Sequence, residues 1–276
     1  MKLTKYFKLF ESRTSDLSEE EFFSILKENC KEFLNDPKCL QRVKNKFEST
    51  YAYIDPKIHN RTDGSNRNVA KNLLLLLDNL PSWKDYPKRN NSIIATSGHT
   101  KNSIYGRDYY ILIPFDGAKF GVVPCQDLWS CKLANQNIYG NSIGALVSSM
   151  YDNNIINSNY ADMIKDIQRI YDTYEKDGLV GWSQSLGRFF DGLKRLGIED
   201  IEDGLNDIFD PNKITGYENT DTFRVSTYSD LVSNGNEIWT DSKCLVYNLG
   251  HFSGEIINID ETFNNFIEKM NSYENK

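Results

Sequence analysis

The order of hydrophobic periods along the chain is the feature that most restricts its fold. Two groups of short, β-rich apolar segments flank residues 141–209, where the apolar residues recur at helical spacing. Because strands and helices come in runs and do not alternate strictly, this order predicts an α+β fold, not a doubly wound parallel sheet. We expect the strands after the helical stretch to rejoin the sheet formed by the strands before it.

Local signals predict the individual elements. A helix is expected over residues 17–34, where Ser18 and Glu21 form a capping box, and a buried helix over residues 69–80. Strands are expected over residues 39–43, 49–55, 92–96, 108–114, 119–124, 222–227, 236–240 and 243–249.

Turn and terminal residues add three expectations. The sequence Phe115-Asp116-Gly117 predicts a turn that joins residues 108–114 and 119–124 as a hairpin-like pair. Gly197 is expected to end the last long helix of the helical stretch. The polar tail, residues 271–276, is expected to be frayed.

Length and composition set broad limits on function. The 276 residues suit one domain, residues 1–276, with a helical block at 141–210 inserted between the two halves of its sheet. A net charge of −7 does not favour nucleic acid as a partner. The longest apolar run, Leu73–Leu77, is far shorter than a membrane span, and the five cysteines lack paired spacing. These features predict free thiols and a cytoplasmic protein, of the host cell if it is encoded by a phage.

Common catalytic fingerprints are absent from the sequence. It contains no phosphate-binding P-loop and no glycine-rich dinucleotide turn, and "GWSQS" at residues 181–185 departs from the serine-hydrolase elbow. Cys125 with His99 or His251 as its base stays open as a nucleophile pair. No histidine stands near Cys125 and Cys131 at zinc-ligand spacing, so no metal site is expected.

Four polar residues in strand contexts form the remaining constellation. Arg42 lies in "CLQRV", Thr96 and Ser97 end the segment "SIIATS", and Glu237 begins "EIWT". This order resembles the Arg–Ser–Glu class of mono-ADP-ribosyltransferases, which includes bacterial toxins and phage proteins. The resemblance implies a split mixed or antiparallel sheet core of that type, with an N-terminal helix and a helical insertion.

The resemblance also implies a chemistry that uses NAD as a substrate. Cleavage of the nicotinamide–ribose bond passes through an oxocarbenium-like transition state, as in glycoside cleavage. Glu237 would stabilise the developing positive charge through the ribose 2′-hydroxyl, and Ser97 would hold Glu237 in its rotamer. Nicotinamide leaves as a neutral molecule, so no general acid is required.

Four further residues are expected to bind NAD. Arg42 would provide a planar cationic fork for the diphosphate, with Arg61 from the polar loop beside it. Thr96 would contact the ribose, and Tyr105 would stack on nicotinamide.

Two questions stay open in the sequence. Gly235 stands two residues before Glu237, where arginine-modifying members of the class carry Glu or Gln, so the acceptor is an unknown protein or nucleic acid. The alternative function is a non-enzymatic phage structural or interaction protein that uses its helical block as a binding surface. In that case Thr96 and Ser97 only close a strand.

Overall fold

The structure of the protein is a computed structural model that describes residues 15–44, 49–58, 67–98, 108–139, 142–155, 159–177, 184–216, 220–251 and 259–274. The chain divides into two compact units. The first comprises Met1–Asn60, Asn91–Gly121 and Ser226–Lys276, and the second comprises Arg61–Asn90 and Val122–Val225. The expected helical block, residues 141–210, therefore belongs to a larger unit that also contains residues from both sides of it.

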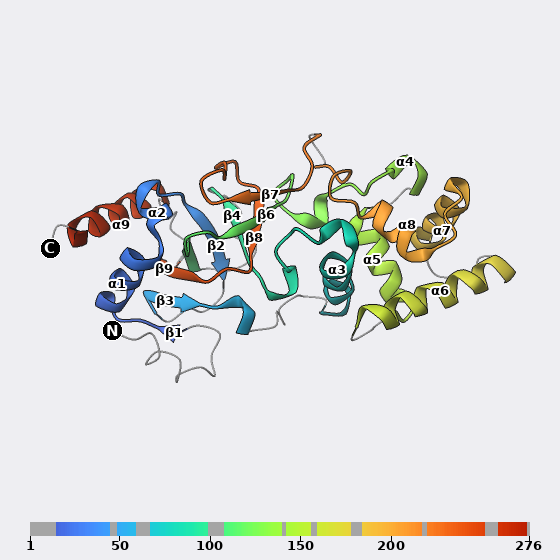
Figure 1. Ribbon diagram of the computed structural model, residues 1–276, viewed down its shortest axis with the longest axis horizontal. Coiled ribbons are helices and arrows are strands. Elements are labelled where there is room, and N and C mark those ends of the chain that lie inside the picture. The colour runs from blue at the N-terminus through green and yellow to red at the C-terminus, as the bar shows by residue number, and fades with distance from the viewer. Residues whose placement is uncertain are drawn as a thin grey trace. The chain divides into compact units, whose positions relative to one another are not determined.

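A sheet of nine strands runs through the described part of the chain in the order β1-β3-β9-β5-β2-β4-β8-β6-β7 (Figure 1). The strands are β1 Ser15–Asp16, β2 Leu40–Lys44, β3 Tyr51–Ile54, β4 Ile93–Ser97, β5 Asp108–Pro114, β6 Lys119–Val122, β7 Arg224–Thr227, β8 Glu237–Thr240 and β9 Cys244–His251. Neighbouring strands pair antiparallel along the part of this order that runs β1-β3-β9-β5-β2-β4-β8. The fold class is thus α+β, and the late strands β8 and β9 do rejoin the early strands.

The expected hairpin between β5 and β6 is wrong. The turn itself forms, since the Ala118 N–H donates to the Phe115 carbonyl over 3.2 Å. However, β5 lies between β9 and β2, whereas β6 lies between β8 and β7. Both hydrogen-bonding edges of β5 are therefore occupied, and β6 must pair elsewhere.

The first unit contains three helices among its described residues: α1 Glu19–Asn29, α2 Lys31–Asn35 and α9 Ile259–Glu274. The capping box before α1 is present, with the Glu21 N–H donating to Ser18 Oγ over 3.2 Å. Cys30, at φ −127° and ψ 45°, interrupts the expected single helix over residues 17–34. The frayed tail was wrongly predicted for residues 271–274, which are helical because α9 buries Phe266 and Met270 one turn apart.

Aromatic rings attach α1 and α9 to one face of the sheet. The Phe266 ring stacks on Tyr247 of β9 with centroids 4.3 Å apart, and Phe22 of α1 contacts Tyr51 of β3 at 5.0 Å. Phe22 and Phe266 also contact each other, at 6.3 Å. Phe22, Phe266 and Tyr51 are buried and Tyr247 is half-buried, and together they form the apolar core on this side of the first unit.

The second unit is helical. Its helices are α3 Arg67–Asn79, α4 Gln136–Tyr139, α5 Ile143–Asp152, α6 Tyr160–Asp177, α7 Gln184–Leu196 and α8 Ile201–Ile208. Short 3₁₀ helices lie at Pro81–Trp83 and Leu128–Ser130 in this unit, at Pro56–Ile58 in the first unit, and at Arg89–Asn91 where the two units meet in sequence. Gly197 ends α7 at φ +67°, as predicted. No helix in the described ranges is both long enough and apolar enough to cross a membrane.

Candidate functional site

Three adjacent strands carry the four residues of the predicted constellation. Arg42 lies on β2, Thr96 and Ser97 end β4, and Glu237 begins β8. β4 pairs with β2 on one side and with β8 on the other, although Glu237 follows Arg42 by 195 positions in sequence. The expected return of a late strand to the early part of the sheet thus brings these three strands together.

The register places Thr96 and Glu237 directly opposite each other. Thr96 pairs with Glu237 on one side and with Gln41 on the other, so the three residues form a row across three strands. Side chains of such partners share a face, with Cβ atoms about 4.5–5.5 Å apart. Gln41 is 1% exposed, Glu237 is 9% exposed, and Thr96 is half-buried.

The same row continues to the far side of the sheet. Gln41 pairs with Ile111 of β5, Ile111 with Tyr247 of β9, and Tyr247 with Tyr51 of β3. Glu237 therefore lies on the face that α1 and α9 cover further along. A carboxylate in such a low-dielectric setting acts more strongly on a nearby positive charge than it would in water.

Arg42 and Ser97 lie on the other face of the sheet. Ser97 pairs with Leu40, and side chains alternate along a strand, so Arg42 shares the face of Leu40 and Ser97 and not that of Gln41. On this face, Leu40, Ala95 and Ile238 border an enclosed apolar space too small for water. The register thus separates Arg42 from Glu237 by the thickness of the sheet.

The charge of Arg42 acts on a thiol of that second face. Burial raises the pKa of the Cys244 thiol, and the nearby Arg42 charge lowers it in part. The register agrees with this, because Arg42 pairs with Tyr110 and Cys244 pairs with Pro114, four residues further along β5 on the same face.

Ser97 contacts the turn before Glu237 and not Glu237 itself. Its hydroxyl donates to Asn234 Oδ1 over 2.9 Å and to the Asn236 carbonyl over 3.3 Å. Its backbone also pairs with this turn, because the Gly235 N–H donates to the Ser97 carbonyl over 2.6 Å. The expected contact that holds the Glu237 rotamer is replaced by an anchor for the turn, since Ser97 points to the opposite face.

Thr96 and Gly98 complete the end of β4. The Thr96 hydroxyl is shared between the Gln41 and Gly98 carbonyls, each at 3.2 Å. Gly98 has φ +110°, and a Cβ there would lie 2.6 Å from Ser233 Oγ. Gly98 is required by this close approach and by its backbone angle.

Several predicted residues lie outside the described part of the chain. Arg61, Tyr105 and His99 are among them, so their predicted roles stay predictions. For His251 the structure describes only the backbone, at the end of β9. The pairing of Cys125 with either histidine is therefore untested.

Sequence reasoning missed the residues that build the Ser97 turn. Asn234 accepts from Ser97 and also from the Asn236 N–H, the latter over 3.1 Å, and Gly235 has φ +78°. The Asn-Gly pair in "SNGN" is a turn signal that could have located this anchor. Gln41 carried only the weak signal of a polar residue in an apolar strand.

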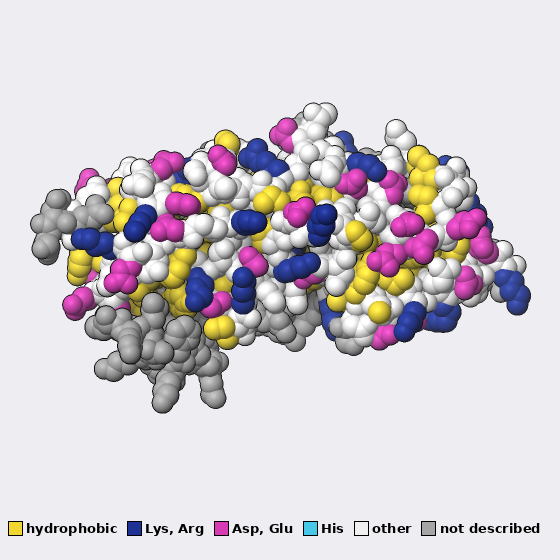
Figure 2. Space-filling view, viewed as in Figure 1, with side chains coloured by type: hydrophobic (Ala, Val, Ile, Leu, Met, Phe, Trp, Pro, Cys, Tyr) yellow, Lys and Arg dark blue, Asp and Glu magenta, His cyan; other side chains and the backbone are white. Residues whose placement is uncertain are grey.

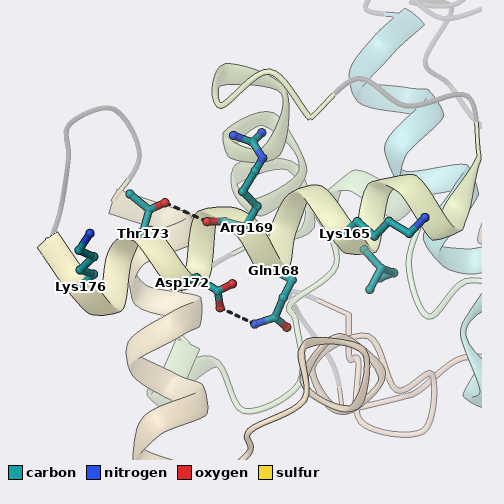
Figure 3. A pocket seen from close by; sticks show the side chains of 7 residues that line it. Lys165, Gln168, Arg169, Asp172, Thr173 and Lys176 are labelled. Atoms are coloured by element: carbon teal, nitrogen blue, oxygen red, sulfur yellow. Dashed lines mark hydrogen bonds between the residues drawn. The ribbon is translucent and has the colours of Figure 1, made fainter.

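A separate surface hollow lies on α6 (Figure 3). The described residues that line it all belong to this one helix, and two of its three basic side chains pair with acidic residues of the same helix. Lys165 pairs with Asp162 at 3.6 Å, and Arg169 pairs with Asp166 at 3.4 Å. Basic and acidic side chains are likewise interspersed over the face drawn in Figure 2. The hollow is the open flank of a solvated helix and does not enclose a ligand.

Comparison of the chain with protein-family models, with curated proteins and with solved structures gives no match.

Proposed function

We propose that the chain is an NAD-dependent mono-ADP-ribosyltransferase in which Glu237 promotes cleavage of the nicotinamide–ribose bond. One observation carries the proposal: β4 and β8 pair so that Thr96 and the buried Glu237 lie opposite each other where both strands reach one end of the sheet. The ADP-ribose would pass to a protein, to a nucleic acid or to water.

The chemistry requires one well-placed carboxylate. As the C–N bond lengthens, positive charge develops on the ribose ring, and nicotinamide takes the bonding electrons and leaves neutral. A carboxylate hydrogen-bonded to the ribose 2′-hydroxyl stabilises that charge most strongly where water is excluded. Glu237 meets the requirement of low exposure, and the Thr96 oxygen can still accept a hydrogen bond from a ribose hydroxyl.

The register changes the roles assigned to the other residues. Ser97 supports catalysis in this proposal only by fixing the turn that leads into β8. Arg42 lies on the opposite face, so it can contact the diphosphate only if NAD passes around the strand ends. Arg61 remains the other predicted diphosphate ligand.

A second candidate function is favoured by the hydroxyl contacts. The Thr96 and Ser97 hydroxyls both donate to groups of the fold itself, which is what residues that simply close a strand would do. A non-enzymatic interaction protein would use them in this way. It would neither bind NAD nor release nicotinamide from it.

Two measurements separate these functions. NAD at 100 times its dissociation constant should stabilise the folded chain by about 2.7 kcal/mol, visible as a rise in melting temperature. Glu237→Gln should keep this shift but lower nicotinamide release by roughly 10²-fold, because it removes charge without changing size. Glu268→Gln, at an exposed position of α9, is the matched control and should behave as wild type.

Each outcome has a clear reading. No melting shift at millimolar NAD, with no nicotinamide release from the wild-type chain, rejects the enzyme and leaves the interaction protein. Binding of NAD with equal release by wild type and Glu237→Gln rejects Glu237 as the catalytic carboxylate.

A further inference from the structure

Two thiols of the second unit lie in contact in the loop after β6. Cys125 Sγ and Cys131 Sγ are 3.0 Å apart and are not joined by a disulfide bond. A disulfide bond is about 2.05 Å long, so the two sulfur atoms need to approach by only about 1 Å to bond. At 3.0 Å they are already within the contact distance from which one reacting atom attacks another.

The loop folds into this geometry through its own hydrogen bonds. The Asp127 carboxylate caps the short helix Leu128–Ser130 by accepting from the Trp129 N–H over 3.0 Å. The Ser130 N–H donates to the Asp127 carbonyl over 3.0 Å, which turns the chain back towards Cys125. The Cys125 thiol donates to the same carbonyl over 3.1 Å.

A backbone bridge fixes the far end of the loop. The Lys132 N–H donates to the Thr215 carbonyl over 2.9 Å, and the Thr215 N–H donates back over 3.3 Å. Cys131, next to Lys132, is therefore held against a second segment of the same unit. The two thiols are brought together without needing a covalent bond.

Cys125 differs from the other four cysteines in its access to solvent. Cys125 is half-buried, whereas Cys131 and the other three are buried. Burial raises the pKa of Cys39 to about 12 and also raises the pKa values of Cys30 and Cys244. Since the thiolate is the nucleophile, those three are poor at exchange.

We propose that Cys125 and Cys131 form a thiol–disulfide exchange site for low-molecular-weight disulfides, with Cys125 as the attacking thiol and Cys131 as the resolving thiol. The Cys125 thiolate attacks one sulfur of the small disulfide, breaks its S–S bond and releases one small thiol, which takes the proton of Cys125. The Cys131 thiolate then attacks the Cys125 sulfur, forms the 125–131 bond and releases the second small thiol with the proton of Cys131. The protein loses two electrons and the small disulfide gains them.

Exchange suits the site better than metal binding does. A structural zinc site takes four ligands, usually with several thiolates or imidazoles together. Among the described residues, no group of three or more His, Cys, Asp and Glu side chains is arranged to hold a metal ion. Two thiols in contact are sufficient for a disulfide.

The test uses the folded full-length chain with excess oxidised glutathione, acid quenching and peptide mass spectrometry. Wild type should form the 125–131 disulfide and retain no glutathione. Cys131→Ser should stop at one glutathione on Cys125, and Cys125→Ser should react at least 10-fold more slowly. Cys39→Ser, at a buried cysteine outside the pair, is the control and should match wild type.

Two results would overturn the exchange site. One is a wild-type chain that keeps a glutathione on Cys125 to the same extent as Cys131→Ser, which would show that Cys131 does not resolve it. The other is modification of Cys30, Cys39 and Cys244 as fast as Cys125, which would show reaction through unfolding. If a serine variant fails to fold, the second comparison can be made on the wild-type chain. The rate at which iodoacetamide alkylates Cys125 is then compared with its rates at Cys30, Cys39 and Cys244.

Discussion

The two halves of one cross-strand row differ sharply in the side chains that they carry. In the half on β3 and β9, Tyr51 and Tyr247 pack against aromatic rings of α1 and α9. In the half on β2, β4 and β8, the row consists of Gln41, Thr96 and Glu237. Both halves lie on the same face, and the ladders between them are antiparallel.

This difference separates stability from chemistry within one sheet. Burying aromatic side chains contributes strongly to folding, whereas burying a carboxylate and an amide costs free energy that hydrogen bonds only offset. The aromatic half therefore stabilises the sheet, and the polar half introduces a carboxylate with no comparable apolar gain. Charged groups kept in buried positions occur often at functional sites, which is why we place the proposed chemistry there.

The largest expected effect comes from the aromatic half. Phe266→Ala should lower the free energy of unfolding by about 3–5 kcal/mol, because it leaves a cavity among buried rings. Urea denaturation measures this. Phe266→Leu, which keeps more of the volume, should lose clearly less. A loss below about 1 kcal/mol for the alanine variant would show that α9 contributes little, contrary to the comparison.

Backbone strain at the polar end gives the next effect. Gly98→Ala should cost about 2 kcal/mol, because φ +110° lies outside the left-handed region that side chains tolerate and the new Cβ meets Ser233. Gly117→Ala is the matched control, since it has φ +76° with no atom near its Cβ, and it should cost about 1 kcal/mol. Removal of the Ser233 hydroxyl from the Gly98→Ala variant should recover only the part of the lost stability that comes from the steric contact. Equal losses at both glycines would contradict the close approach at β4.

A double-mutant cycle tests whether the Ser97 side chain interacts with Asn234 or with Glu237. Ser97→Ala should cost about 1 kcal/mol, and its coupling with Asn234→Ala should be roughly 0.5–1.5 kcal/mol, because the two side chains share a hydrogen bond. Ser97→Ala and Glu237→Gln should instead be additive, since these side chains point to opposite faces. Coupling between Ser97 and Glu237 in place of Asn234 would restore the role that the resemblance assigned to Ser97.

The sequence predicted where strands lie better than it predicted which strands pair with each other. The strands that hold Arg42, Thr96 and Glu237 were expected where they lie, because β-rich apolar segments and turn residues are local signals. Which strands pair is a non-local property, so the hairpin of β5 and β6 was wrong although its turn formed. The helix α9 was not predicted because few apolar residues stand among its many polar ones. Its buried face is identified only by the packing of Phe266 against Tyr247.

The sequence also could not predict on which face of the sheet a side chain lies. Arg42 and Glu237 are each plausible in a strand, but whether they share a face depends on the register of β4 with both neighbours. A shift of one residue in either ladder would have placed them together. The resemblance could supply the order of the residues but not this register.

The smallest expected effect lies at the rim of the aromatic half, where an ion pair borders Tyr51. Lys269 Nζ donates to Glu19 Oε2 and to Tyr51 Oη, each over 2.6 Å, and the charged side chains are 38% and 40% exposed. Glu19→Gln should therefore destabilise the chain by only about 0.5 kcal/mol at low salt, because solvent screens exposed pairs. Glu20→Gln is the matched control, since it removes the same charge from the first turn of α1, so the helix-dipole effect cancels in the difference. In 1 M salt, where the screening length is about 3 Å, that difference should shrink towards zero. A difference that persists in high salt would mean that Glu19 acts through the hydrogen bond that it accepts from Tyr51 Oη over 2.8 Å, and the aromatic half would then extend to the surface of the sheet.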